Sequence, residues 1–133
     1  MHRLNRKEGI KLLKSYIELK LSKLKWYQQI ESHIKAIVFY GSTAKGLNGA
    51  DSDLDILIFV PLSIELKYTK GEYFYHYNDR EINIVMRSIE RLRKLAKEQH
   101  NSFESEVFKK CKILSESDSE VKTLIKKIRT VKN

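Results

Sequence analysis

Apolar residues in the first 30 positions recur at steps of three and four. They are Ile10, Leu13, Ile17, Leu21 and Leu24, and lysines stand among them at positions 7, 11, 14, 20 and 23. This spacing places the apolar side chains on one face, so the segment is predicted to form an amphipathic helix. Its lysines either face solvent, which is the commoner role of lysines on a helix, or bind a polyanion.

Two short apolar runs in the middle of the chain are typical of buried strands. Residues 34–40 (IKAIVFY) stop at Gly41, and residues 54–60 (LDILIFV) are closed by Pro61. Both runs are rich in β-branched and aromatic residues, and proline cannot donate a hydrogen bond to a sheet. We therefore predict two central strands that flank residues 41–53.

The rest of the chain predicts a hairpin and then helices. Residues 72–77 (EYFYHY) and 81–86 (EINIVM) flank the polar turn 78–80. The helices are marked by Ile89, Leu92 and Leu95, by Phe103, Val107 and Phe108, and by Val121, Leu124, Ile125 and Ile128 after a capping-box match at Ser117–Glu120. This order predicts an α/β (α+β) fold for residues 1–133, a single domain with one mixed β-sheet flanked by helices.

Composition agrees with one folded, soluble domain. The chain has 133 residues, 41% of them hydrophobic, and a net charge of +9 that favours polyanionic partners. Its single cysteine, Cys111, excludes a disulfide framework and suits a reducing compartment, as a buried small apolar residue. No apolar stretch is long enough to span a bilayer, so we expect a cytoplasmic protein with no membrane partner.

The segment between the two central strands carries the candidate chemistry. A buried strand runs into Gly41 and Ser42, where backbone amides at the start of a short helix would suit a phosphate. Asp53 and Asp55 stand two residues apart at the mouth of the second strand, so their carboxylates face the same side. Two neighbouring carboxylates repel each other unless a cation neutralises them, and Mg²⁺ prefers such oxygen ligands.

Each half of this pattern also has an ordinary interpretation. Strand, glycine and helix recur in many proteins, and Asp-Ser-Asp before a strand suits a polar turn. A Gly-Ser turn and an Asp-x-Asp pair that are separated by ten residues, between two strands that can pair side by side, indicate a phosphate and metal site more specifically than either does alone.

The stretch GSTAKGLNGADSDLD resembles the signature of the polymerase-β-type nucleotidyltransferase superfamily, Gly-Ser, ten residues and then Asp-x-Asp. It is most similar to the small single-domain members called minimal nucleotidyltransferases (MNT). Gly46 stands where that family often has a second glycine, and Ser52 begins the usual S-D-x-D. The match is close over residues 34–60 and loose over 81–86.

The resemblance implies transfer of a nucleoside monophosphate, AMP from ATP in the first instance, to a hydroxyl acceptor with release of pyrophosphate. It implies two Mg²⁺ ions, or Mn²⁺ in their place, bound by the catalytic residues Asp53 and Asp55. The nucleoside triphosphate would be held by Gly41, Ser42, Lys45, Gly46 and Ser52. Minimal members commonly act as the antitoxin of a toxin-antitoxin system, adding adenylate to a tyrosine of a HEPN-type ribonuclease toxin.

One position departs from the family pattern. The family places a third carboxylate on a later strand, where it ligates metal and takes the acceptor proton, and Asn83 stands there in this chain. An asparagine oxygen can ligate a metal but cannot act as a base. Glu81 points to the same face and is the alternative third catalytic group, or else an exposed strand-end residue.

Several alternative functions and residue roles stay open. A catalytically silent module that binds nucleotide or protein is the alternative that Asn83 favours, and nucleic-acid binding through the basic helices is weaker. Lys45 suits solvent as well as phosphate. The aromatic strand at 73–77 is more typical of sheet packing than of base stacking, and His33 and His100 have no neighbouring zinc-ligand pattern.

Overall fold

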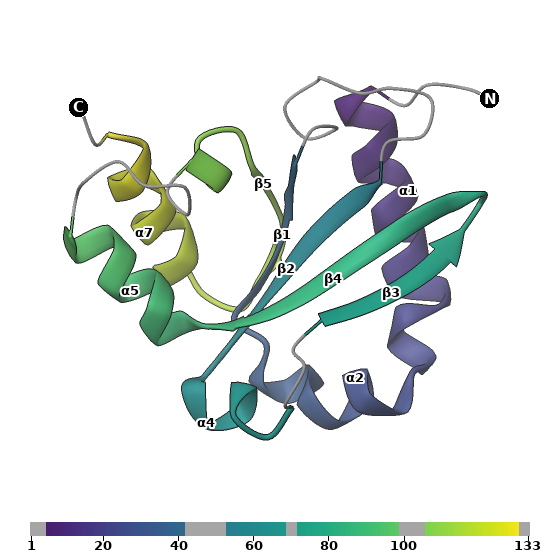
Figure 1. Cartoon of the computed structure of the whole chain (residues 1–133), viewed down its shortest axis with the longest axis horizontal. Helices are drawn as coiled ribbons and strands as arrows, with labels where there is room; N and C mark the ends of the chain where they lie inside the picture. The colour runs from purple at the N-terminus through teal and green to yellow at the C-terminus, as the bar shows by residue number, and fades with distance from the viewer. Residues whose placement is uncertain (1–4, 42–52, 69–71, 99–105, 131–133) are drawn as a thin grey trace.

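The computed structural model describes residues 5–41, 53–68, 72–98 and 106–130, and their strands form one mixed sheet (Figure 1). The order across the sheet is β3-β4-β2-β1-β5. The β2–β4 pair is parallel, and the other pairs are antiparallel. The strands are β1 (Ala36–Tyr40), β2 (Leu54–Val60), β3 (Glu72–Tyr77), β4 (Arg80–Ser88) and β5 (Lys112–Glu116). The mixed sheet flanked by helices in a small α+β domain is confirmed.

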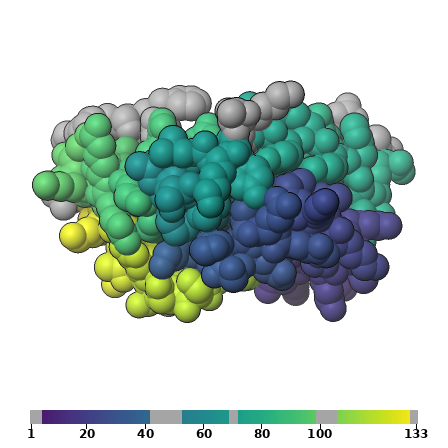
Figure 2. All heavy atoms as spheres, turned by 90° about the horizontal axis from the view of Figure 1, so that it is seen from below, coloured from purple at the N-terminus to yellow at the C-terminus, as the bar shows by residue number. Residues whose placement is uncertain are grey.

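Helices cover both faces of this sheet. The helical elements are α1 (Arg6–Leu19), η1 (Leu21–Lys23), α2 (Lys25–Ile30), η2 (Glu31–His33), α4 (Leu62–Glu65), α5 (Ile89–Glu98) and α7 (Glu120–Arg129). Figure 2 shows the N-terminal elements and the green-to-yellow C-terminal elements on opposite sides of the molecule. No helix in the described ranges is both long and apolar enough to cross a membrane.

The prediction of one amphipathic helix over the first 30 residues is wrong in its continuity. The helix ends at Leu19, and η1 and α2 turn the chain under the sheet. A straight helix over residues 6–30 would be roughly 37 Å long, whereas the nine residues of β4 span about 30 Å. The break therefore keeps Leu21, Tyr27 and Ile30 buried against the sheet.

The helix caps also differ from the prediction. The capping box lies at α1, where Glu8 N–H donates to Asn5 Oδ1 at 2.8 Å and Asn5 N–H donates to Glu8 Oε1 at 3.2 Å. The capping box predicted at Ser117 is wrong, because Ser117 N–H donates to Lys35 O at 2.9 Å and so continues the sheet. Helix α7 begins at Glu120, whose N–H donates to Asp118 Oδ1 at 2.9 Å.

The hairpin is confirmed, with a tighter turn than predicted. Asn78 and Asp79 both have positive φ, 49° and 61°, and Arg80 already belongs to β4. Two central residues of positive φ match the right-handed twist of the strands that they join. Of the predicted helix around Phe108, residues 106–107 are helical and a turn follows, while Phe103 lies outside the described residues.

The two faces of the sheet have different neighbours. One face, which includes Phe39, Ile56 and Ile84, packs against α1 and α2. The opposite face carries Val38, Leu57 and Phe59, which pack against α5 and α7 at one end of the strands. Asp55 and Asn83 belong to this second face, since each is an even number of residues from Leu57 or Val85 in its strand.

Candidate functional site

Asp53, Asp55 and Asn83 meet where β2 and β4 begin. Asp55 and Asn83 are register partners in the parallel β2–β4 pair, and Asp53 lies immediately before β2. Asn83 Nδ2 donates to Asp53 Oδ2 at 3.2 Å and to Asp55 Oδ1 at 3.0 Å. The period of two residues in a strand thus brings both carboxylates to one amide group.

Burial makes the charge on Asp55 costly. Desolvation raises the pKa of the Asp55 carboxyl, the hydrogen bond from Asn83 lowers it, and the charge of Asp53 raises it again. The net shift is upward, which shows that the amide alone does not offset burial. A cation beside both carboxylates would favour their charged forms.

The oxygen of the Asn83 side chain is the unsatisfied atom in this cluster. Asn83 Oδ1 is buried and has no hydrogen-bond partner in the described parts of the chain. A buried carbonyl oxygen without a partner costs free energy, and metal ligation is one way to satisfy it. Two carboxylates and an amide oxygen are hard-oxygen ligands of the kind that suits Mg²⁺. Because Nδ2 is the amide atom that faces the carboxylates here, the amide group would have to turn over to bring Oδ1 to a cation between them.

The site is smaller than a closed protein cage for a metal. Among the described residues, no three His, Cys, Asp or Glu side chains gather as a metal site. Asp53 and Asp55 would therefore share a cation with other oxygens, as Mg²⁺ sites with one or two carboxylates do.

Gly41 forms the wall beside Asp55. It follows Tyr40, the last residue of β1, and Tyr40 is the register partner of Asp55. Gly41 has φ of 87°, a conformation that glycine adopts without steric cost. A β-carbon at this position would collide with Asp55 Oδ2 and lie 3.2 Å from Asp55 Cγ.

The other predicted nucleotide-binding residues are Ser42, Lys45, Gly46 and Ser52, and they lie outside the described residues. Glu81 is half-buried on β4, two residues before Asn83 and on the same face, and its register partner is His76. The hydrogen bonds that reach both aspartates come from Asn83. His33 lies in η2 and is exposed.

Aromatic residues stand at both ends of the row that contains the carboxylate. Across the sheet the row reads Tyr40, Asp55, Asn83 and Phe74. Burial, followed by the charge of Asp55, raises the pKa of Tyr40 to about 12, so the phenol stays protonated. Phe74 is 63% exposed and leaves the outer end of the row apolar and open.

Only alternate residues of the predicted aromatic strand face this site. Tyr73 and Tyr75 lie on the other face, where Tyr73 stacks on Trp26 at 4.0 Å between ring centroids and the Tyr75 hydroxyl accepts from Trp26 Nε1 at 2.8 Å. Phe74 and His76 lie on the face of Asn83 and Glu81. Sheet packing therefore accounts for Tyr73 and Tyr75. Alternate residues of a strand face opposite sides of the sheet, so Phe74 lies on the other face from these two tyrosines.

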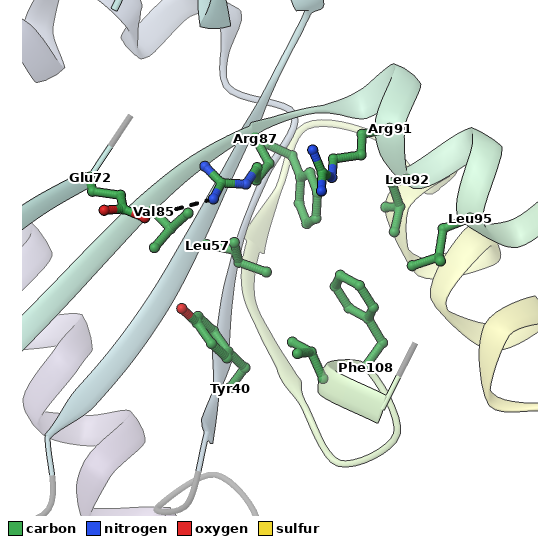
Figure 3. A pocket seen from close by; sticks show the side chains of 11 residues that line it. Tyr40, Leu57, Glu72, Val85, Arg87, Arg91, Leu92, Leu95 and Phe108 are labelled. Carbon is green, nitrogen blue, oxygen red and sulfur yellow. Dashed lines mark ion pairs between the residues drawn. The ribbon is translucent and has the colours of Figure 1, made fainter. Parts of the chain in front are cut away.

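A pocket of about 420 Å³ on this face was not predicted from the sequence (Figure 3). Its lining includes Tyr40 from β1, Arg87 from β4, Arg91 from α5 and Phe108 from the turn after residue 107. These residues come from three separate parts of the chain, at positions 40, 87–91 and 108, and have no motif spacing. The one sequence signal related to the pocket is the apolar face of α5, which predicts that this helix packs on the sheet.

The comparisons with known proteins support the fold and identify the family. The structure is similar to that of a nucleotidyltransferase-like protein from Exiguobacterium sibiricum, with a TM-score of 0.58 and 11% sequence identity. The alignment covers 91% of this chain and 40% of that one, so this chain spans less than half of that protein's length. No curated protein sequence matches significantly. Residues 20–132 match the family model of the nucleotidyltransferase domain, and the chain therefore belongs to that family.

Proposed function

We propose that this protein is a Mg²⁺-dependent nucleotidyltransferase that moves a nucleoside monophosphate, AMP from ATP, to a hydroxyl acceptor. The observation that carries the proposal is the convergence of Asp53 and Asp55 on Asn83, beside the close backbone approach of Gly41. General nucleotidyl transfer is what the family performs. The metal, the nucleotide and the acceptor are the proposed parts.

The proposed roles follow from the chemistry of each residue. Asp53 and Asp55 hold two Mg²⁺ ions, with Mn²⁺ as a substitute, and Asn83 Oδ1 is available as a neutral ligand. When bound, a pair of divalent ions neutralises charge on the attacking and leaving oxygens of a phosphoryl transfer. Gly41 lets the backbone pass beside the Asp55 carboxylate, and Ser42, Lys45, Gly46 and Ser52 hold the triphosphate next to it.

The transfer needs a proton acceptor, which Asn83 cannot be. An acceptor oxygen forms a bond to the α-phosphorus, the bond from that phosphorus to the bridging oxygen breaks, and pyrophosphate leaves. We assign the acceptor's proton to Glu81, which lies on the same face of β4 as Asn83. Asp53 and Asp55 position the substrate through the cations that they would hold.

The acceptor that we propose is a tyrosine hydroxyl of a HEPN-type partner protein, which would make this chain an antitoxin. The support is the family resemblance of the minimal nucleotidyltransferases, together with the open end of the catalytic row at Phe74. Nucleic acid is the weaker acceptor, suggested by the net charge of +9.

One observation favours a second function, that of a silent nucleotide- or protein-binding module. Asn83 Nδ2 donates to both aspartates, so an amide group already satisfies part of the pair without a metal. A module of this kind would bind nucleotide or a protein and release no pyrophosphate.

The experiment that tests the proposal is thermal unfolding with each of the four nucleoside triphosphates, with and without Mg²⁺. The wild type is compared with an Asp53→Asn, Asp55→Asn double variant, and the readout is the ligand-induced shift within each protein. A ligand at about 100 times its Kd stabilises a fold by roughly 2.7 kcal/mol. A Mg²⁺-dependent shift that the double variant lacks supports the nucleotide site, and no shift with any nucleotide contradicts it.

A second measurement separates the enzyme from the silent module. Pyrophosphate release with Mg²⁺ or Mn²⁺ and a supplied HEPN-type partner is followed together with the mass of that partner. An added nucleotide that depends on Asp53 identifies the enzyme. Nucleotide binding without pyrophosphate or an adduct identifies the silent module.

A further inference from the structure

The pocket lies on the face of the sheet that carries Asp55 and Asn83, next to these two residues along β2 and β4. Its wall begins at Tyr40, which pairs with Asp55, and its floor includes Leu57 and Val85, each two residues beyond a member of the site. Two residues of a strand span roughly 7 Å. A ligand anchored at Asp55 therefore reaches the pocket within the length of one sugar ring and its substituent.

The middle of the pocket is apolar and bordered by aromatic rings. Leu57 and Phe59 of β2 line it, and Tyr40 and Phe108 lie on opposite sides of Leu57 (Figure 3). Phe108 is buried and packs against Phe59, with 6.1 Å between ring centroids. Its volume of about 420 Å³ lies within the range of about 300 to 1,000 Å³ typical of small-molecule sites. Such a space suits a flat, largely apolar ring system.

The polar end of the pocket offers both hydrogen-bond donors and an acceptor. Arg87 and Glu72 line it together, and Arg87 Nη2 lies 3.9 Å from Glu72 Oε1. Their side chains are 33% and 52% exposed, so each keeps hydrogen-bonding capacity for a ligand. A guanidinium donates to ring nitrogens or carbonyl oxygens, and a carboxylate accepts from amino groups. The edges of purine bases present both kinds of group side by side.

The position of the pocket along β4 separates it from the proposed proton acceptor. Val85 lies two residues after Asn83, and Glu81 lies two residues before it. An in-line displacement places the acceptor opposite the leaving group, so the nucleoside and the acceptor need different spaces. The pocket at Val85 suits the nucleoside, and the open side of the sheet at Glu81 and Phe74 suits the acceptor.

We infer that this pocket binds the purine base of the nucleoside triphosphate and that Arg87 and Glu72 select the base; the inference rests on the function proposed above. The pocket is then the specificity site of the enzyme. The phosphates bind independently of it, at Gly41 and the aspartates.

The test uses a variant that fills the pocket. Val85→Trp adds a bulky ring to the floor, and Leu66→Trp is the matched control, because Leu66 is 71% exposed on the turn after α4. Dissociation constants are measured with Mg²⁺ for ATP, GTP, CTP, UTP and inorganic tripolyphosphate. The wild type is expected to prefer a purine nucleotide by about tenfold or more, a usual size for discrimination by pocket contacts. Val85→Trp should remove this preference and leave tripolyphosphate binding unchanged, and Leu66→Trp should match the wild type.

A second variant guards against a folding defect in Val85→Trp. Glu72→Gln changes an exposed side chain and keeps its size, so the fold should be retained, and the ranking of ATP against GTP should change. Equal binding of all four nucleotides by the wild type, or purine binding that survives Val85→Trp, overturns the inference while the proposed function stands. Binding of neither nucleotide nor tripolyphosphate contradicts both.

Discussion

Gly41 passes so close to Asp55 that a β-carbon on Gly41 would collide with the Asp55 carboxylate oxygen Oδ2. The end of β1 and the start of β2 are thus in close contact at the site, and this contact requires a glycine at position 41. The close approach also leaves the carboxylate little room to turn, which holds it in the direction of Asn83. A substitution at Gly41 should therefore affect stability and activity together.

Gly41→Ala should destabilise the fold and abolish Mg²⁺-dependent nucleotide binding. The positive φ of 87° alone costs a non-glycine residue roughly 1–2 kcal/mol, and the clash with Asp55 adds to it. Urea unfolding of Gly41→Ala, Asp55→Ala and the double variant measures both parts. Because Asp55→Ala removes the clashing atom, alanine at position 41 should cost less in that background, and equal costs in both backgrounds would refute the contact.

Without divalent cations, Asp55→Asn should raise the Tm at neutral pH, and it should also remove the Mg²⁺-dependent activity. The pKa of Asp55 is raised in the folded state, mainly by burial, so its ionisation opposes folding. The stability that the protonated group contributes is complete below the ordinary pKa of 3.8 and is lost as pH rises through the folded-state pKa. Asparagine keeps the acceptor for Asn83 and carries no charge.

The pH dependence of the Tm checks this sign. The gain of Asp55→Asn over the wild type should be largest at neutral pH and should disappear in acid, where the wild-type carboxyl is protonated. A gain that grows as the pH falls would be the opposite of the expected result.

Asn83→Asp should make the site more dependent on metal. Without a cation, three carboxylates repel one another, and the lost amide bonds to charged groups cost about 1.5–3 kcal/mol each. With Mg²⁺, the added charge should enlarge the metal-induced rise in Tm beyond that of the wild type. Asn83→Ala is the control, since it loses the same hydrogen bonds without adding charge, and an equal response of both variants to Mg²⁺ would argue against Asn83 as a ligand position.

The strands of the site could be predicted because their signals are local. β2 occupies residues 54–60 as expected, since the apolar run is bounded by Asp53 and Pro61. β5 was missed, because Lys112–Glu116 is only partly buried and is held to β1 mainly by backbone pairing. An edge strand of this kind has no apolar period to reveal it.

The candidate site was only partly accessible from the sequence. The two-residue spacing of Asp53 and Asp55 predicts a shared direction, and the structure brings Asn83 to both of them. The pocket depends instead on Phe108 packing across the sheet onto Phe59, a contact between residues 49 positions apart. Contacts of that range follow from the packing of α5 and α7 on the sheet, which no local pattern specifies.

Tyr75→Phe should lower the free energy of unfolding by about 1 kcal/mol, a typical value for a lost hydrogen bond. The Tyr75 hydroxyl accepts from Trp26 Nε1 at 2.8 Å, and Trp26 keeps its stacking on Tyr73 in the variant. Trp26 is the single tryptophan of the chain, so its fluorescence reports the change directly. Tyr77→Phe is the matched control, because it loses a 3.0 Å bond to Ser15 and leaves Trp26 untouched. Identical emission changes in both variants would contradict the assignment.

The ion pair between α5 and α7 should contribute a small, salt-sensitive amount of stability. Arg93 Nε lies 2.6 Å from Glu120 Oε2, and Arg93 Nη2 lies 2.9 Å from Glu120 Oε1. Both side chains are partly exposed, so a double-mutant cycle should give a coupling of about 1 kcal/mol or less. The coupling should fall with added salt, because exposed charges are screened.

The pH dependence of this coupling has the opposite sign to that of Asp55. Arg93 lowers the pKa of Glu120, so the stabilising contribution is present above the ordinary glutamate pKa of 4.5 and is lost as pH falls through the lowered value. The pair Lys94–Glu98, 3.9 Å apart within α5, is the control. The Lys94–Glu98 pair lies within one helix. Of the two ion pairs, therefore, the Arg93–Glu120 pair alone should oppose separation of α7 from α5, as measured by hydrogen exchange in α7. Equal protection of α7 after either pair is removed would show that the apolar contacts of Val121, Ile125 and Ile128 alone hold this helix on the sheet.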